Sequence, residues 1–208
     1  LSHSFFAIPF AASSLLIQQP TDLKIDTILL LIVCIISARS FAMGINRAAD
    51  YRWDKENPRT QKRLVASGEI SVKTTYFISL VFAAILIFSS FKLNFEAGVL
   101  SPLLILVLGS YSYLKRYTFC CHIYLGLCLA LSPIAVSIAL SQTIGLNLIL
   151  LSLAITCWIA AFDVLYALQD LDFDLSSKLN SIPVKFGLNR SLSISLILQI
   201  SALIFLFF

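Results

Sequence analysis

Long uninterrupted apolar runs constrain the fold of this chain more than any other feature. We count about seven runs of the roughly 17–25 residues that cross a bilayer as a helix. Only 12% of the 208 residues are charged and 59% are hydrophobic, whereas soluble domains carry about a quarter charged residues. A transmembrane barrel would need short alternating strands, which the sequence lacks. We therefore expect an all-α integral membrane protein, built as one domain over residues 1–208.

Two polar stretches, residues 46–73 and 169–190, interrupt the apolar pattern and divide the expected spans. The chain ends inside an apolar run, so we expect the domain to be shortened at its C-terminal end. The expected spans cover about residues 5–17, 27–44, 74–91, 98–114, 123–140 and 146–165, followed by a last span from residue 191 onward.

The basic residues predict the orientation in the membrane, because Lys and Arg accumulate in loops on the cytoplasmic side. Only Lys24 and Lys92 fall on one side of the expected spans. Twelve others fall on the opposite side, and the alternation of spans places them there independently. We expect an inner, cytoplasmic membrane of a bacterium, with these loops facing the cytoplasm. The twelve are Arg47, Arg52, Lys55, Arg59, Lys62, Arg63, Lys73, Lys115, Arg116, Lys178, Lys185 and Arg190.

Charge concentrates suddenly where the second expected span ends. Asn46, Asp50 and Asp54 follow one another at intervals of four residues, so on a helix their side chains share one face. Two carboxylates one turn apart repel each other unless a cation lies between them. Asn and Asp oxygens suit a hard ion such as Mg²⁺, which often bridges carboxylates to a phosphate.

A second acidic cluster has the same spacing and the same position at the end of an apolar run. Asp170 and Asp174 are four residues apart, and Asp172 lies between them on another face. Tyr166 precedes Asp170 by one turn and could hydrogen-bond a phosphate, although a structural tyrosine is as good an interpretation. Asp163 could share the face of Asp170.

Other charged groups near the clusters have plainer interpretations. Asp163 could pair with Arg39, an intramembrane arginine that we expect to face the interior of the bundle. His122 is expected to be a packed or capping histidine rather than a base.

The charge balance favours a bound anion over a passing cation. Two Mg²⁺ would cancel the four carboxylates of the two clusters, and a diphosphate would then need basic partners. Arg binds phosphate oxygens as a bidentate fork and Lys acts as a point charge. Metal and basic groups on a diphosphate stabilise it as a leaving group. The candidates are Arg47, Arg63, Lys115 and Arg116.

An allylic prenyl diphosphate is the substrate that this arrangement suits. Its departure generates a delocalised cation, which an apolar, aromatic-lined cavity protects from water. We expect partners of three kinds, namely a polyprenyl diphosphate, a small aromatic acid and the lipid bilayer. We infer no nucleic acid and no protein partner.

Two other classes use acidic residues in membranes. A divalent-cation transporter would place acidic groups along a path through the bilayer and is often built from inverted repeats, which we do not see. A CDP-alcohol phosphatidyltransferase would carry an Asp-Gly and Ala-Arg sequence before Asp50, which is missing.

The two clusters resemble the signatures of the UbiA-type family of intramembrane aromatic prenyltransferases. Asn46-Arg47-x-x-Asp50-x-x-x-Asp54, followed by Asn57-Pro58-Arg59-Thr60 and Arg63, is similar to the first signature of that family. Tyr166-Ala-Leu-Gln-Asp170-Leu-Asp172-Phe-Asp174, followed by Ser181-Ile-Pro-Val-Lys-Phe-Gly187, is similar to the second. Tyr113, Lys115 and Arg116 match a basic turn, and residues 3–10 resemble the first helix of the hydroxybenzoate branch.

The resemblance implies a bundle of nine spans around a central cavity, of which about seven are present here. It also implies Mg²⁺-dependent transfer of a polyprenyl chain to the ring carbon ortho to the phenol oxygen of 4-hydroxybenzoate, in ubiquinone or menaquinone biosynthesis. Dihydroxynaphthoate and haem are alternative acceptors. Lys178 departs from the family, because many relatives have glycine there. By position, the metal and catalytic set would be Asn46, Asp50, Asp54, Asp170 and Asp174, and the substrate-binding set Asn46, Arg47, Arg63, Lys115, Arg116 and Tyr166.

Overall fold

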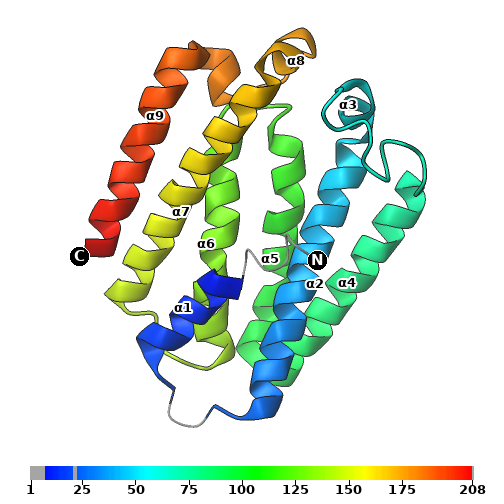
Figure 1. Cartoon of the computed structure of the whole chain (residues 1–208). Coiled ribbons are helices and arrows are strands. Elements are labelled where there is room, and N and C mark those ends of the chain that lie inside the picture. The colour runs from blue at the N-terminus through cyan, green and yellow to red at the C-terminus, as the bar shows by residue number, and fades with distance from the viewer. Residues whose placement is uncertain (1–7, 21–22, 208) are drawn as a thin grey trace. The chain divides into compact units, whose positions relative to one another are not determined.

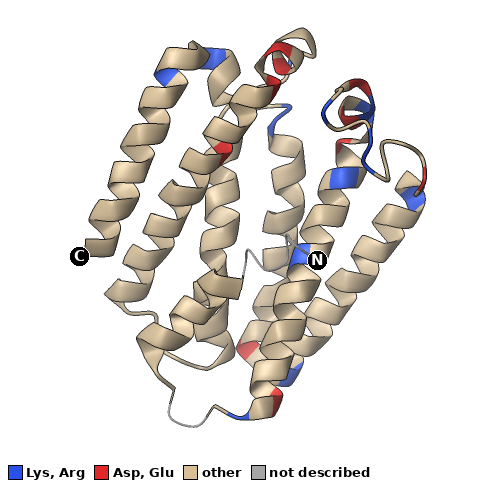
Figure 2. Ribbon diagram, viewed as in Figure 1, with Lys and Arg blue, Asp and Glu red and all other residues tan. Residues whose placement is uncertain are grey.

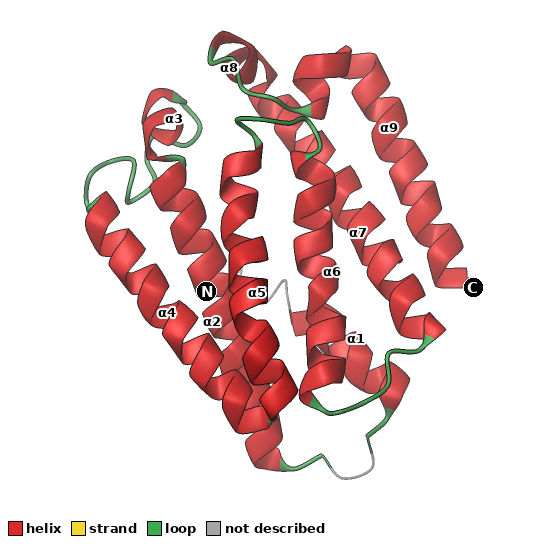
Figure 3. Ribbon diagram, turned by 180° about the vertical axis from the view of Figure 1, so that it is seen from behind, coloured by secondary structure: helices red, strands yellow, loops and turns green. Residues whose placement is uncertain are grey.

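The computed structural model describes residues 8–20 and 23–207, and every regular element in these ranges is a helix (Figure 3). The chain forms two compact units. Unit 1 contains residues 20–113 and unit 2 contains residues 7–19 and 114–208, apart from the residues outside the described ranges. The expected all-helical membrane fold is confirmed. The central cavity and the single domain remain predictions.

Unit 1 is built from three long helices and one short one (Figure 1). They are α2 (Ile25–Ala49), α3 (Tyr51–Glu56), α4 (Val72–Leu93) and α5 (Phe95–Leu114), the last of which leads into unit 2. Side-chain oxygens cap two of them. Ser71 accepts the N–H of Thr74 (3.0 Å) at the start of α4, and Asn94 accepts the N–H of Ala97 (2.7 Å) at the start of α5.

The core of unit 1 lies where α2 packs along α4. Phe41 and Ile45 of α2 and Ala83 of α4 form its buried centre, and partly buried side chains of α5 contact it. The helices approach closely because Gly44 faces Ser79, and a β-carbon at Gly44 would collide with the Ser79 side chain. Small residues at such crossings are typical of membrane helices.

Unit 2 contains α1 (Ile8–Gln18), α6 (Cys121–Ala139), α7 (Leu146–Ala167), the 3₁₀ turn η1 (Leu168–Asp170), α8 (Leu171–Ser176) and α9 (Ile182–Phe207). Helix α7 packs against both α6 and α9, and α1 packs on α6. Ala130, Ile155 and Ile159 form a buried cluster between α6 and α7. Ser195 of α9 donates a hydrogen bond to the Ala161 carbonyl of α7 (3.0 Å).

Six helices of the described residues are long and apolar enough to span a membrane, where the sequence suggested about seven. The difference lies in the first expected span, residues 5–17, of which the described part forms the 11-residue α1. The last span also begins earlier than residue 191. Helix α9 starts at Ile182, and Gly187 (φ 75°, ψ 175°) separates its first turn from the long remainder. Glycine reaches this backbone conformation without a steric penalty.

The 46–73 and 169–190 stretches also contain more helix than a loop would. Helix α3 follows the first motif, and η1 and α8 carry the second. Acidic and basic residues gather mainly at helix ends and in these stretches, which leaves most of each long helix uncharged (Figure 2).

Candidate active site

The first motif lies at the junction between α2 and α3. Asp50 (φ −86°, ψ 6°) separates the two helices, yet its N–H still donates to the Asn46 carbonyl (2.9 Å) and its carbonyl accepts from the Asp54 N–H (2.8 Å). The Asn46 side-chain amide donates to Oδ2 of Asp50 (3.0 Å). The predicted neighbourhood of Asn46 and Asp50 on one helix face is therefore confirmed, and the amide fixes the Asp50 carboxylate.

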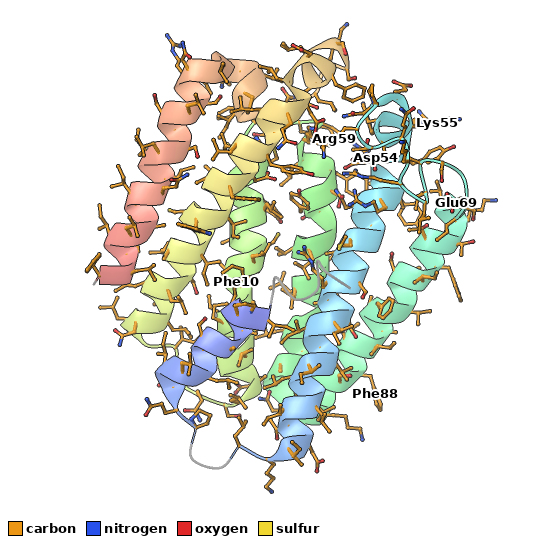
Figure 4. The ribbon with its side chains drawn as sticks, viewed as in Figure 1. Phe10, Asp54, Lys55, Arg59, Glu69 and Phe88 are labelled. Carbon is orange, nitrogen blue, oxygen red and sulfur yellow. The ribbon has the colours of Figure 1, made fainter. Side chains whose placement is uncertain are left out.

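Asp54 has a different environment. Its side chain is 10% exposed and forms an ion pair with Arg63 (Nη1–Oδ1 2.6 Å), while Arg47 lies 3.8 Å from Oδ2. Thr60 donates its hydroxyl to the Asp54 carbonyl (3.0 Å) and so ties the following turn to α3. The labelled side chains of this end of unit 1 include Asp54 and Arg59, whereas Phe88 lies far along α4 (Figure 4). Two of the predicted diphosphate-binding arginines thus meet one aspartate.

The second motif is divided between η1 and α8 of unit 2. Asp170 is the last residue of η1 and is partly exposed, and Asp174 lies in α8 and is fully buried. Lys115 reaches Asp174 with an Nζ–Oδ1 distance of 2.8 Å. The other oxygen of Asp174, Oδ2, is buried without a hydrogen-bond partner among the described residues. Leaving such an acceptor unpaired is costly, so this oxygen is suited to a ligand.

Asn180 holds the turn that carries Lys115 and Arg116. Its N–H donates to the Lys115 carbonyl (2.8 Å), and its side-chain amide donates to the Arg116 carbonyl (3.0 Å). The sequence analysis missed this residue, because nothing in its position predicts that it contacts residues 64 and 65 positions away. Asn180 keeps the basic turn next to the second motif.

Asp163 and His122 form a buried connection between three helices. His122, 2% exposed, places Nδ1 2.7 Å from Oδ2 of Asp163 in α7, and its Nε2 accepts the backbone N–H of Ile182 at the start of α9 (3.2 Å). Because Nε2 accepts, the ring proton belongs on Nδ1, where it is donated to the carboxylate. The predicted packed or capping role of His122 is confirmed. The partner of Asp163 is His122, which neither expectation for this aspartate had named.

The remaining candidates of unit 2 lie near the surface of the unit. Tyr166 is 42% exposed, and Asp172 is exposed on α8, as the spacing predicted. Lys178 adopts a positive φ of 54°, which explains why glycine suits this position in relatives. Helix α8 ends there, and the Leu179 N–H turns back to the Asp174 carbonyl (3.0 Å).

Each unit therefore combines a partly exposed aspartate with a buried aspartate that is paired to a base. Within the described residues, no three side chains of His, Cys, Asp or Glu gather closely enough to hold a metal ion on their own. The carboxylate and amide oxygens are hard donors that fit Mg²⁺, and a diphosphate would supply the further oxygens that such an ion requires. The geometry of each unit is thus compatible with a metal that is bound together with phosphate.

Comparison with known proteins agrees with this chemistry. The sequence profile of the UbiA prenyltransferase family matches residues 6–208. A 4-hydroxybenzoate octaprenyltransferase of Shewanella pealeana is 31% identical over 181 residues, which cover 87% of this chain and 60% of that protein. The chain spans about three fifths of the length of the curated relatives that it matches (57–62% for the first three).

Solved structures show the same fold. An apo UbiA homologue from Aeropyrum pernix K1 is 29% identical, with a TM-score of 0.90 over 98% of this chain and 77% of that one. A UbiA homologue from Archaeoglobus fulgidus, solved with DMAPP and Mg²⁺, is 20% identical, with a TM-score of 0.81 over 96% of this chain and 71% of that one. From its profile match over nearly its whole length, the chain belongs to the UbiA prenyltransferase family.

Proposed function

We propose that this protein transfers a polyprenyl chain from a prenyl diphosphate to 4-hydroxybenzoate in a quinone pathway, with Mg²⁺ as cofactor. The observation that carries the proposal is the repeated pairing of a buried aspartate with a base, Asp54 with Arg63 and Asp174 with Lys115, in a member of this family. The names of the relatives support the acceptor. Dihydroxynaphthoate and haem remain alternative acceptors, and family membership favours a transferase over a cation transporter.

In the proposed reaction the bond between the allylic carbon and the diphosphate oxygen breaks, and diphosphate leaves with the electron pair. The ring carbon ortho to the phenol oxygen then bonds to the allylic carbon and loses its proton. Mg²⁺ would supply positive charge to the leaving oxygens. We propose Asn46, Asp50, Asp54, Asp170 and Asp174 as the residues that hold the metal and diphosphate.

The basic residues would take charge from the leaving diphosphate directly. Before a ligand binds, Asp54 orients Arg63 and Asp174 orients Lys115, so both bases are already held when phosphate oxygens arrive. Such preorganisation lowers the cost of stabilising developing charge. Arg47, Arg116 and Tyr166 would complete the phosphate contacts.

The proposed location is a bacterial inner membrane, with both motifs at its cytoplasmic surface. The excess of Lys and Arg in the loops that carry the motifs supports this orientation. The connectivity supports it as well, because α2, α5 and α7 all run toward a motif loop or the basic turn, and one intervening span separates each from the next.

Transfer of labelled 4-hydroxybenzoate into lipid tests the function. Membranes with the wild-type protein should form product from a prenyl diphosphate only when Mg²⁺ is present, and a chelator should stop the reaction. Asp50→Asn or Asp170→Asn should lower the rate on the order of 10²–10³-fold, the range seen when a charge-stabilising group is removed. Asp172→Asn, which changes an exposed carboxylate of the same segment, is the matched control and should retain activity.

Full activity of both motif variants would overturn the mechanism. Competition among 4-hydroxybenzoate, dihydroxynaphthoate and haem identifies the acceptor, and a preference for either of the last two would replace the proposed one.

A further inference from the structure

One basic side chain lies far from every loop. Arg39 is in α2, ten residues before its end at Ala49, which is about 15 Å along the helix axis. This helix is among the six candidate membrane spans. Its guanidinium Nε is buried and has no hydrogen-bond partner among the described residues. A charged residue in a span is costly and usually serves a function.

The position of Arg39 on α2 relates it to the first motif. Asn46 follows after seven residues and Asp50 after eleven, so all three fall on nearly the same face of the helix. Arg39 is about 10 Å deeper along the axis than Asn46. Helical side chains lean toward the helix N-terminus, so that of Arg39 leans away from the motif. It is therefore poorly placed to bind the phosphates that the motif would hold.

Tyr111 of α5 marks the direction of this face within unit 1. It interacts electrostatically with Arg39 and also with Arg47, so the two arginines lie on the side of α2 that faces α5. The charge of Arg47 is already matched by Asp54 at 3.8 Å. No acidic side chain of the described residues forms a salt bridge with Arg39.

We propose that Arg39 is the subsite for the carboxylate of the aromatic acceptor. The inference rests on the proposed function, in which an aromatic acid must bring its charge below the membrane surface. With diphosphate held at the motif end, the ring would lie beside the allylic carbon and its carboxylate would point deeper, toward Arg39. A guanidinium binds a carboxylate through two parallel hydrogen bonds, and this pairing is strong where water is excluded.

The proposal makes acceptor charge the property that Arg39 recognises. 4-Hydroxybenzoate and its methyl ester have the same ring and phenol, and only the acid carries the charge. Initial rates with purified full-length chain in lipid nanodiscs, at saturating Mg²⁺ and prenyl diphosphate, give the KM of each acceptor. The wild type should prefer the acid strongly, and Arg39→Gln should remove most of that preference.

Arg39→Gln should raise the KM of the acid at least tenfold, the change expected when a hydrogen bond between two charged groups is lost. The KM of the prenyl diphosphate should stay within twofold, because the phosphates bind elsewhere. Arg39→Lys, which keeps the charge without the fork, should fall between. Arg52→Gln is the matched control, since Arg52 is an exposed arginine of α3, and should change neither KM.

Several results would overturn the subsite. An unchanged KM of the acid in Arg39→Gln would do so, as would an equal loss of affinity for prenyl diphosphate, which would make Arg39 a phosphate ligand. If Arg39→Gln does not fold, a wild type that uses the ester as well as the acid also overturns it. A wild type that prenylates no aromatic acid overturns the proposed function and the subsite together, whereas normal wild-type activity limits the failure to Arg39.

Discussion

Two aspartates with the same sequence spacing have different surroundings in each motif. Asp50 and Asp170 are partly exposed, whereas Asp54 and Asp174 are buried and paired with Arg63 and Lys115. Four carboxylates of equal rank were predicted from the spacing. The structure instead separates those open to a ligand from those that already hold a base, and this difference matters for how each substitution should be read.

Lys178 offers a test at the scale of one backbone angle. Its φ of 54° is a left-handed conformation that costs an ordinary residue about 1 kcal/mol relative to glycine. Lys178→Gly should therefore raise the free energy of unfolding by about 0.5–1 kcal/mol, since the exposed lysine side chain loses little. Unfolding in detergent micelles with increasing denaturant measures this change.

Lys178→Ala provides the control, because alanine removes the charge but keeps the β-carbon. It should leave stability nearly unchanged. Equal stabilisation by glycine and alanine would show that charge, rather than backbone conformation, sets the cost at this position.

Local spacing predicted the neighbours along one helix but not the contacts between distant residues. The Asn46–Asp50 hydrogen bond follows from an interval of four residues. The contacts of Asn180 with the Lys115 turn, and of His122 with Asp163, join residues from 41 to 64 positions apart. No periodicity encodes these, because they depend on which helices pack together. The resemblance to a family named the site residues, and only the structure showed which are paired.

Helix packing in unit 2 depends on one glycine. A β-carbon at Gly126 of α6 would collide with the backbone of Thr156 in α7, and backbone cannot move aside as a side chain can. Gly126→Ala should therefore lower the free energy of unfolding by about 1–3 kcal/mol, the usual cost of overpacking. Thermal unfolding in micelles, followed by circular dichroism, would measure the loss.

Gly109→Ala is the matched control at the same scale. Gly109 also lies inside a long helix, α5, but a β-carbon there meets the Phe41 ring only at 3.4 Å. Since alanine is the better helix former, this substitution should be neutral or slightly stabilising. Similar destabilisation at both positions would contradict a specific role of the α6–α7 contact.

The elements themselves were largely predictable, and their ends were not. Five of the expected spans match α2, α4, α5, α6 and α7 to within five residues at each end, because runs of apolar residues of membrane-spanning length leave few alternatives. The helices α3 and α8 lie in polar stretches where hydrophobicity carries no signal. Helix α9 begins before its apolar run, and its kink at Gly187 depends on a backbone angle.

At the scale of the molecule, each compact unit carries one aspartate motif. Under the proposed function both motifs bind the same metal diphosphate, which makes a quantitative prediction. If Asp50 and Asp170 serve one ligand, removing either loses much of the binding, and removing the second adds little. The affinity for a non-hydrolysable prenyl thiodiphosphate with Mg²⁺ should therefore be non-additive in Asp50→Asn, Asp170→Asn and the double variant.

A coupling energy of about 0.5–3 kcal/mol is the range for residues that share a network, and we expect the upper half of it because a metal ion would be lost as a whole. Pairing Asp50→Asn with Asp172→Asn supplies the reference, since the exposed Asp172 should add independently. Additivity of Asp50 and Asp170 to within about 0.5 kcal/mol would mean that the motifs bind separate ligands. In that case one shared diphosphate could not explain the repeated aspartate–base pairs, and each unit would need a ligand of its own.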